Sequence, residues 1–227
     1  MDLNIQYMKN LPAGALFDLD GVLVDTESIY THIWEDIERT YPTGIENFAI
    51  KIKGNTLANI LNTYYPDAAT SAKVCAMLDE REREMEYAIF DGVTAFLEDL
   101  REHHVPAAIV TSSNNAKMER LAKREPYFRS LFDAMVTDSC VSHSKPHPEP
   151  YMTGASMLGV APERCIVFED SFAGMQSGRA SGAAVVALAT TNPRESIVGK
   201  ADTIIDGFGG LTLETLLELL SEGGRSF

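Results

Sequence analysis

Two patterns of apolar positions divide the 227-residue chain. From Thr94 onward, short apolar runs that fit buried strands alternate with stretches in which apolar residues recur every three or four positions. An earlier run, 13–17, fits a first strand. Further strands are expected at 107–110, 134–136, 165–168, 184–188 and 203–205, and helices at 94–103, 115–123, 150–158, 173–181 and 213–220. This alternation predicts a mostly parallel sheet with helices on both faces, which is a Rossmann-like α/β core.

In the segment 25–89, apolar residues recur with the spacing of a helix, and no strand pattern occurs. Helices are expected over 28–40, from Thr56 to Pro66 and over 71–87. In the last of these, the charged run 79–84 is predicted to be a solvated face with pairs such as Asp79 and Arg83. An all-helical insert after the first strand predicts two domains, with the core formed by 1–24 and 90–227 and a small helical domain formed by 25–89.

The composition is that of an ordinary soluble globular protein, with 45% apolar and 23% charged residues. No apolar run approaches the roughly 18 residues of a membrane helix. The segment Met1–Asn10 has neither the basic nor the apolar region of a secretory signal. The three cysteines are scattered and odd in number, which favours reduced thiols and a cytoplasmic location.

The net charge of −14 argues against two classes of partner. Nucleic acids require a basic surface, and anionic membranes repel an acidic one. A small anionic ligand is still compatible, because charges beyond a Debye length of roughly 8–10 Å are screened and a few local cations can dominate a cleft. We expect a monomer.

Two aspartates follow the first strand at the point where it should end. Asp18 and Asp20 are separated by one residue and followed by Gly21, so their carboxylates start on the same side of the chain. Two carboxylates that close require a cation between them or a proton on one of them. They predict either a divalent metal site or an acid beside a nucleophile. The alternative is a simple strand-to-turn signal.

Polar residues end two further strands. Thr111 could hold phosphoryl oxygens with its hydroxyl, together with the backbone N–H groups of Ser112 and Ser113. From the residues alone, a helix N-cap is the more common reason for such a sequence. Glu169 and Asp170 would complete an oxygen-only site suited to Mg²⁺, with Asp18 and the backbone carbonyl of Asp20.

Lys145 lies in a segment where three prolines exclude a helix. A stiff loop that presents one lysine suits a phosphate clamp, and its charge can keep Asp18 ionised. The alternative is a surface lysine in a proline-rich turn. His143 and His147 are four residues apart on the same broken loop, so a zinc pair on a helix is not expected. We interpret both histidines as structural or as neighbours of the site entrance.

Taken in order, the motifs D-L-D-G-V-L-V-D-T, T-S, K-P and E-D-S resemble those of the haloacid dehalogenase superfamily of phosphotransferases. The resemblance runs from about Pro12 to Leu220 and is strongest to the branch of β-phosphoglucomutase and small sugar-phosphate phosphatases. It implies that Asp18 is the nucleophile, that Asp20 is the acid/base, and that Thr111 and Lys145 hold the phosphoryl group. It also implies a Mg²⁺ cofactor and a helical cap over the site.

The cap then selects the substrate. The resemblance places the loop containing Lys53, Gly54 and Asn55 at the site, where these residues could bind substrate. Mutase-like members carry a His and an Arg where this chain has Tyr30 and Leu57. Neither replacement suits a second phosphate, which favours hydrolysis of a small phosphorylated metabolite. The alternatives are a phosphosugar mutase and a non-catalytic protein that binds a phosphometabolite.

Overall fold

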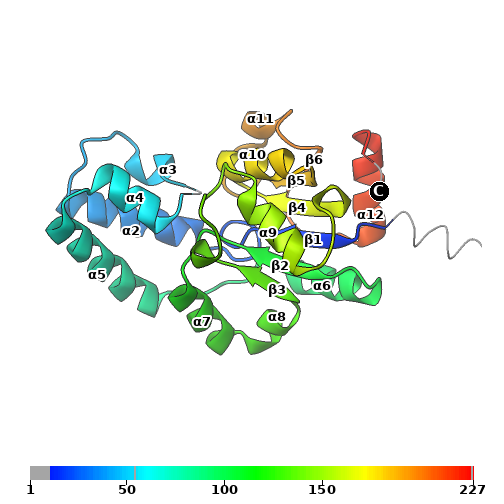
Figure 1. Ribbon diagram of the computed structural model, residues 1–227, viewed down its shortest axis with the longest axis horizontal. Helices are drawn as coiled ribbons and strands as arrows, with labels where there is room; N and C mark the ends of the chain where they lie inside the picture. Colours follow the sequence, from blue (N-terminus) through cyan, green and yellow to red (C-terminus); the bar gives the residue numbers. More distant parts are fainter. Residues whose placement is uncertain (1–10, 54, 226) are drawn as a thin grey trace, which may run out of the picture.

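A six-stranded parallel sheet forms the centre of the computed structural model, which describes residues 11–53, 55–225 and 227 (Figure 1). The strands are β1 (Gly14–Phe17), β2 (Ala107–Val110), β3 (Ala134–Val136), β4 (Cys165–Glu169), β5 (Ala184–Leu188) and β6 (Thr203–Ile205). Their order is β3-β2-β1-β4-β5-β6, and all neighbours run parallel. The chain moves outward from β1 in one direction and then restarts at β4 on its other side. Ligands of such sheets bind beyond the carboxyl ends of the strands at this switch point.

Helices cover both faces of the sheet, as the strand pattern predicts. One face packs against α6 (Val93–Glu102), α7 (Asn115–Arg124), α8 (Pro126–Ser130) and α12 (Leu213–Glu222), and the other against α9 (Glu149–Met157), α10 (Phe172–Ser181) and α11 (Arg194–Ile197). Successive strand residues alternate between the two apolar clusters, so Phe17 and Phe168 face one side while Leu16 and Val167 face the other. The rings of Phe17 and Phe168 stack at 4.4 Å. The predicted α/β fold is confirmed.

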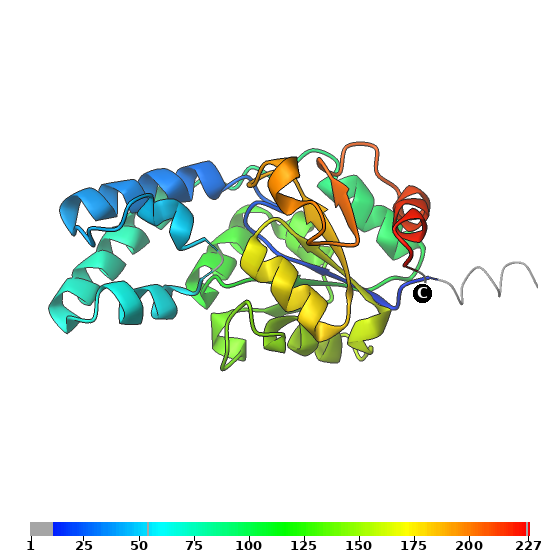
Figure 2. The same ribbon diagram turned by 90° about the horizontal axis from the view of Figure 1, so that it is seen from above.

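A separate group of helices extends from one end of the sheet (Figure 2). It consists of α2 (Glu27–Thr40), α3 (Phe48–Lys51), α4 (Leu57–Tyr64) and α5 (Ala68–Glu84). These helices bury an apolar cluster of their own, which includes Trp34, Ile37 and Phe48. The helical lobe therefore has a core that is distinct from the two sheet clusters. The division at 25–89 as a domain boundary remains a prediction.

Two chain crossings connect the helical lobe to the sheet. They run side by side, with Val24 bridged to Ile89 and with the Asp25 N–H donating to the Ala88 carbonyl at 2.8 Å. The Phe90 N–H donates to the Leu23 carbonyl at 3.1 Å. Backbone hydrogen bonds therefore pair the two crossings into one linker.

The sequence pattern located every strand, but it missed the short helices α3, α8 and α11. Each has only four or five residues, which is too short for a 3.6-residue period to show. The helix α5 also starts at Ala68, three residues earlier than expected, because the Asp67 carboxylate caps the Thr70 N–H. Within the described residues, no helix combines the length and apolarity needed to cross a membrane.

The close contact between α9 and the sheet gives a test of the packing. A Cβ added at Gly154 would lie 2.8 Å from Val110 Cγ2 and 3.2 Å from Leu16 Cδ2. Overpacking costs about 1–3 kcal/mol, whereas replacing a helical glycine by alanine gains at most about 1 kcal/mol. We expect Gly154→Ala to lower the free energy of unfolding by about 1–2 kcal/mol in urea denaturation. The exposed neighbour Ser156→Ala is the control, and equal midpoints for the two variants would contradict the tight contact.

Candidate functional site

The loop after β1 turns the chain immediately beyond the sheet edge. The Asp18 N–H donates to the Phe168 carbonyl at 3.0 Å, which continues the sheet pairing by one residue. Gly21 then adopts a positive φ of 83°. A Cβ at this position would lie 2.2 Å from the Asp170 carboxylate, so glycine is required by both conformation and space. The turn places the first motif directly against the end of β4.

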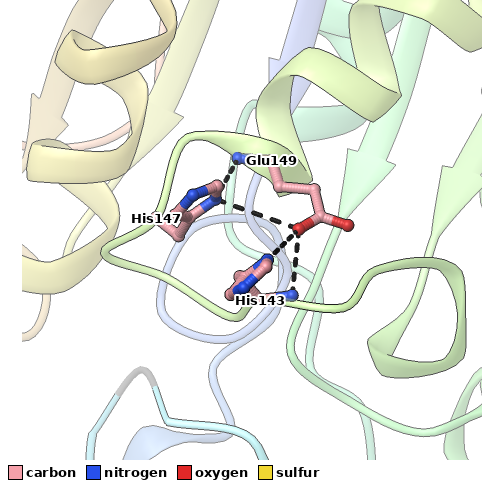
Figure 3. Close-up of side chains that lie close together, drawn as sticks. All are labelled: His143, His147 and Glu149. Carbon is pink, nitrogen blue, oxygen red and sulfur yellow. Dashed lines mark hydrogen bonds and ion pairs between the residues drawn. The ribbon is translucent and has the colours of Figure 1, made fainter.

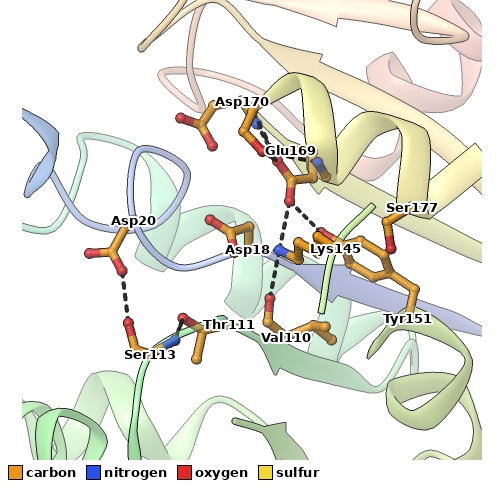
Figure 4. Close-up of polar contacts among 12 residues, drawn as sticks. Asp18, Asp20, Val110, Thr111, Ser113, Lys145, Tyr151, Glu169, Asp170 and Ser177 are labelled. Atoms are coloured by element: carbon orange, nitrogen blue, oxygen red, sulfur yellow. Dashed lines mark hydrogen bonds and ion pairs between the residues drawn. The ribbon is translucent and has the colours of Figure 1, made fainter. Parts of the chain in front are cut away.

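Lys145 lies between two carboxylates in the centre of this edge (Figure 4). Its ammonium is 2.6 Å from Asp18 Oδ1, 2.6 Å from Glu169 Oε1 and 3.1 Å from the Val110 carbonyl oxygen. The side chain is almost completely buried. Burial disfavours the charged amine, but the charges of Asp18 and Glu169 outweigh this and raise the pKa of Lys145. The alternative of a surface lysine in a turn is therefore wrong.

Burial and neighbouring charges act in opposite directions on the pKa of Asp18. Its pKa is raised to about 7, chiefly because burial disfavours the charged form, while the Lys145 charge acts to lower it and the Glu169 charge adds to the rise. A metal ion beside Asp18 would act in the same direction as Lys145 and favour the ionised carboxylate. The site thus holds more negative charge than one lysine neutralises, which is the condition under which a cation binds.

Glu169 is fully buried and both of its oxygens already accept hydrogen bonds. Oε1 accepts from Lys145 and from the Tyr151 hydroxyl at 2.8 Å, and Oε2 accepts from the N–H groups of Asp170 and Ser171, both at 3.0 Å. One oxygen each of Asp18, Glu169 and Asp170 lies within 4.8 Å of the others. This donor set contains oxygen only, which fits Mg²⁺.

Asp20 points away from that group, toward α7 (Figure 4). Its carboxylate accepts from the Ser113 hydroxyl at 3.1 Å and from the Thr26 hydroxyl. The two aspartates therefore do not share a single cation through their side chains. A metal contact from the Asp20 backbone carbonyl remains a prediction.

Thr111, Ser112 and Ser113 follow β2 as expected, and their role in holding phosphoryl oxygens remains a prediction. The Ser113 N–H donates to the Thr111 hydroxyl at 3.0 Å and is engaged within the turn in this conformation. The N-cap of α7 is Asn114, whose side chain accepts from the Lys117 N–H at 2.9 Å. The interpretation of the three residues as a helix N-cap is wrong, and all three line the cavity described below.

Lys117 was not recognised from the sequence. Its ammonium is 2.6 Å from both oxygens of Asp20, and only 1% of the residue is exposed. It also lies 4.3 Å from the centre of the Tyr30 ring. The available signal was its position four residues before Leu121, which places both on the buried face of α7.

A buried polar network joins α7 to the helical lobe. The Tyr30 hydroxyl donates to Glu82 at 2.8 Å, and Arg120 of α7 pairs with Glu82 and, at 3.3 Å, with Asp79. The predicted pair Asp79–Arg83 is present. The prediction that 79–84 is a solvated face is wrong for Glu82, which is 5% exposed because it receives both Tyr30 and Arg120.

Most of the predicted site residues line one cavity of about 130 Å³. From the core, its lining includes Asp18, Asp20, Thr111, Ser112, Ser113, Lys145 and Asp170. From the helical lobe, its lining includes Tyr30, Trp34, Lys53, Asn55 and Leu57. Gly54 lies outside the described residues. The cavity therefore lies between the sheet edge and the lobe, and Glu169 lies behind its wall.

Comparison with known proteins gives consistent matches. The family model described as haloacid dehalogenase-like hydrolase matches residues 15–188. Hexitol phosphatase A of Escherichia coli is 32% identical over 181 residues, which cover 77% of this chain and 82% of that protein. A bifunctional riboflavin kinase/FMN phosphatase of Arabidopsis thaliana is 27% identical over 91% of this chain, and the chain spans 56% of that relative's length.

A solved structure supports the fold. The β-phosphoglucomutase of Clostridium difficile matches with a TM-score of 0.78 at 21% identity, and the match covers 93% of this chain and 98% of that one. At this identity, the likeness concerns the arrangement of the elements and not the substrate.

The pair Lys117–Asp20 can be measured by a double-mutant cycle. Lys117→Met would leave a partly buried carboxylate without its cation, and we expect a loss of about 3 kcal/mol in the free energy of unfolding. Lys117→Met combined with Asp20→Asn should cost much less than the sum of the single changes. Additive effects in urea denaturation would show that the two side chains do not interact.

The raised pKa of Asp18 gives a pH dependence for the metal-free protein. The pKa of Asp18 rises from its ordinary value of 3.8 to about 7 in the folded protein. Between these two pH values, the folded chain holds a proton on Asp18 that the unfolded chain has released. Its contribution to stability is therefore present at low pH and lost as the pH rises through this window. A side-chain amide at this position cannot titrate, so Asp18→Asn should gain stability relative to the unmodified chain between about pH 4 and pH 7.

The measurement is urea denaturation with a chelator across that pH range. Asp206→Asn is the control, because the side chain of Asp206 is 82% exposed and pairs only at the surface with Arg194. A difference between Asp18→Asn and the unmodified chain that stays constant with pH would contradict the shift.

Proposed function

The chain belongs to the haloacid dehalogenase-like hydrolases, and from this premise we propose that it is a Mg²⁺-dependent phosphatase that acts on a small phosphomonoester. The observation that carries the proposal is the buried Lys145 ammonium 2.6 Å from both Asp18 and Glu169, with Asp170 beside them at the cavity. The relation to hexitol phosphatase A supports a sugar or sugar-alcohol phosphate as substrate. The resemblance inferred from the sequence motifs is confirmed at the level of the family.

In the proposed first step, an Asp18 oxygen attacks phosphorus and forms an aspartyl-phosphate while the bond from phosphorus to the alcohol oxygen breaks. Asp20 donates a proton to the departing alkoxide. In the second step, Asp20 takes a proton from water as that water attacks phosphorus and releases Asp18 and inorganic phosphate. Lys145 and the Thr111 hydroxyl hold the phosphoryl oxygens.

Three carboxylates are available for the metal. Asp18 and Asp170 would hold Mg²⁺ directly, and Glu169 would act through water because its oxygens are already occupied by hydrogen bonds. When bound, Mg²⁺ would neutralise negative charge on the phosphoryl oxygens. Lys145 and the bound ion together would favour the ionised, nucleophilic form of Asp18.

The contacts of Asp20 impose a condition on this mechanism. A carboxylate paired with Lys117 is ionised and cannot donate a proton, so Asp20 must leave that lysine or become protonated before it acts as an acid. Its partner Thr26 is the N-cap residue of α2, next to the paired linker. We propose that segment 25–89 is a mobile cap and that its movement changes this contact.

Hydrolysis is favoured over phosphate transfer by the cap residues. The Tyr30 hydroxyl is committed to Glu82 and Leu57 is apolar, so neither offers a cation to a second phosphate. Lys53 and Asn55 are the polar cap residues at the cavity that we propose contact the leaving group.

The unpaired state of Cys75, Cys140 and Cys165 supports the proposed cytoplasmic location, and we propose a monomer.

The proposal predicts Mg²⁺-dependent release of inorganic phosphate from a panel of sugar phosphates, hexitol phosphates and FMN. Asp18→Asn should abolish release because the nucleophile is lost, and Asp20→Asn should lower kcat by roughly 10²–10⁴. Chelation should remove activity and added Mg²⁺ should restore it. Asp206→Asn, a remote surface carboxylate, is the matched control.

Two results would point elsewhere. A product that keeps its phosphate at a new position would identify a mutase. Saturable binding of panel members without turnover, unchanged in Asp18→Asn, would identify a non-catalytic binding protein.

A further inference from the structure

The loop that carries Lys145 presents a second group of potential metal ligands on its outer side. His143, His147 and Glu149 each place one ligand atom within 4.8 Å of the others (Figure 3). The two imidazole rings stack at 4.5 Å, and the two residues are exposed. We propose that these residues form a binding site for Zn²⁺ or a similar transition-metal ion, separate from the carboxylate cluster at the sheet edge.

The donor atoms select the class of metal. Two imidazole nitrogens and one carboxylate oxygen form a set typical of Zn²⁺, and such three-residue sites leave a further position for water. Mg²⁺ prefers oxygen ligands and should stay at Asp18 and Asp170. The two groups on this chain therefore differ in the cation they favour.

The present distances are close to those that the ion requires. His143 Nδ1 is 2.7 Å and His147 Nδ1 is 3.9 Å from the same oxygen, Glu149 Oε2. Ligand atoms around tetrahedral Zn²⁺ lie about 3.3 Å apart. A small opening of the first contact and closing of the second would give that spacing.

A backbone hydrogen bond identifies an acceptor nitrogen on one ring. The Glu149 N–H donates to His147 Nδ1 at 3.2 Å, so this nitrogen carries a lone pair, which a bound ion would take in place of that hydrogen bond. His143 Nδ1 lies 2.7 Å from the carboxylate and would bind the ion in the tautomer that keeps its proton on Nε2, with any proton on Nδ1 released to solvent. Glu149 also accepts the backbone N–H groups of Ser142 at 2.7 Å and His143 at 3.0 Å, which holds the loop in the required shape.

The position of the site connects it to the rest of the molecule. Its ligands lie two residues before, two after and four after Lys145, so a bound ion would cross-link the segment that presents this lysine. His143 and His147 also line a groove whose opposite side includes Asn59 and Asn62 of α4. The open coordination position is therefore accessible from solvent.

The test is calorimetric titration of the untagged full-length protein with Zn²⁺ in excess Mg²⁺, which occupies the carboxylate cluster. We expect one Zn²⁺ per chain and a rise in the melting temperature. His143→Ala and His147→Ala should each weaken binding by at least about tenfold, since loss of even an outer-shell partner costs that much. Glu149→Gln should also weaken Zn²⁺ binding, and its single oxygen still accepts one of the two loop N–H groups.

His32→Ala is the matched control, because His32 is also exposed but lies on α2. Co²⁺ gives a second measurement, since its visible absorption reports nitrogen ligation and should disappear in the His143 and His147 variants. Absence of Zn²⁺ binding in excess Mg²⁺ would overturn the proposal. Binding that is unchanged in both histidine variants, or lost equally in His32→Ala, would overturn it as well.

Discussion

The ammonium of Lys145 is the interaction on which the sheet edge depends. Asp18 and Glu169 come from neighbouring strand ends, β1 and β4, and two buried carboxylates at this separation would repel each other without a cation. Lys145 contacts both at 2.6 Å and also donates to the carbonyl of Val110, the last residue of β2. One side chain thus connects the ends of three adjacent strands. The geometry of the site therefore depends on the conformation of the loop that carries Lys145.

The parallel sheet explains why so much of this edge could be predicted. The motifs at Asp18, Thr111 and Glu169–Asp170 each follow an apolar run, and parallel strands bring their carboxyl ends to one edge whatever the distance between them in the sequence. Asp18, Thr111 and Asp170 therefore meet although about 150 residues separate the first from the last. The order of strands was not needed for this inference, since all of them run in the same direction.

What could not be predicted depends on contacts between the lobe and the core. Lys117 looks like an ordinary helical lysine, and Glu82 belongs to a charged run that would normally face water. Both are buried because α7 of the core lies against α5 and α2 of the lobe, where Arg120 and Tyr30 complete the network. No local pattern encodes the packing of two helices that are about 40 residues apart, so the sequence contains only the residues and not their pairing.

The two aspartates of the first motif illustrate how the structure resolves a conflict that the sequence posed. Adjacent carboxylates required either a shared cation or a proton, yet each has its own lysine: Lys145 for Asp18 and Lys117 for Asp20. The Lys145 pair lies between strands of the core, whereas the Lys117 pair also receives Thr26 beside the linker and lies under Tyr30 of the lobe. A movement of the lobe relative to the sheet would therefore change the surroundings of Asp20 and leave those of Asp18 intact. This difference in environment would allow two identical side chains, two residues apart, to take the different chemical roles that we propose for them.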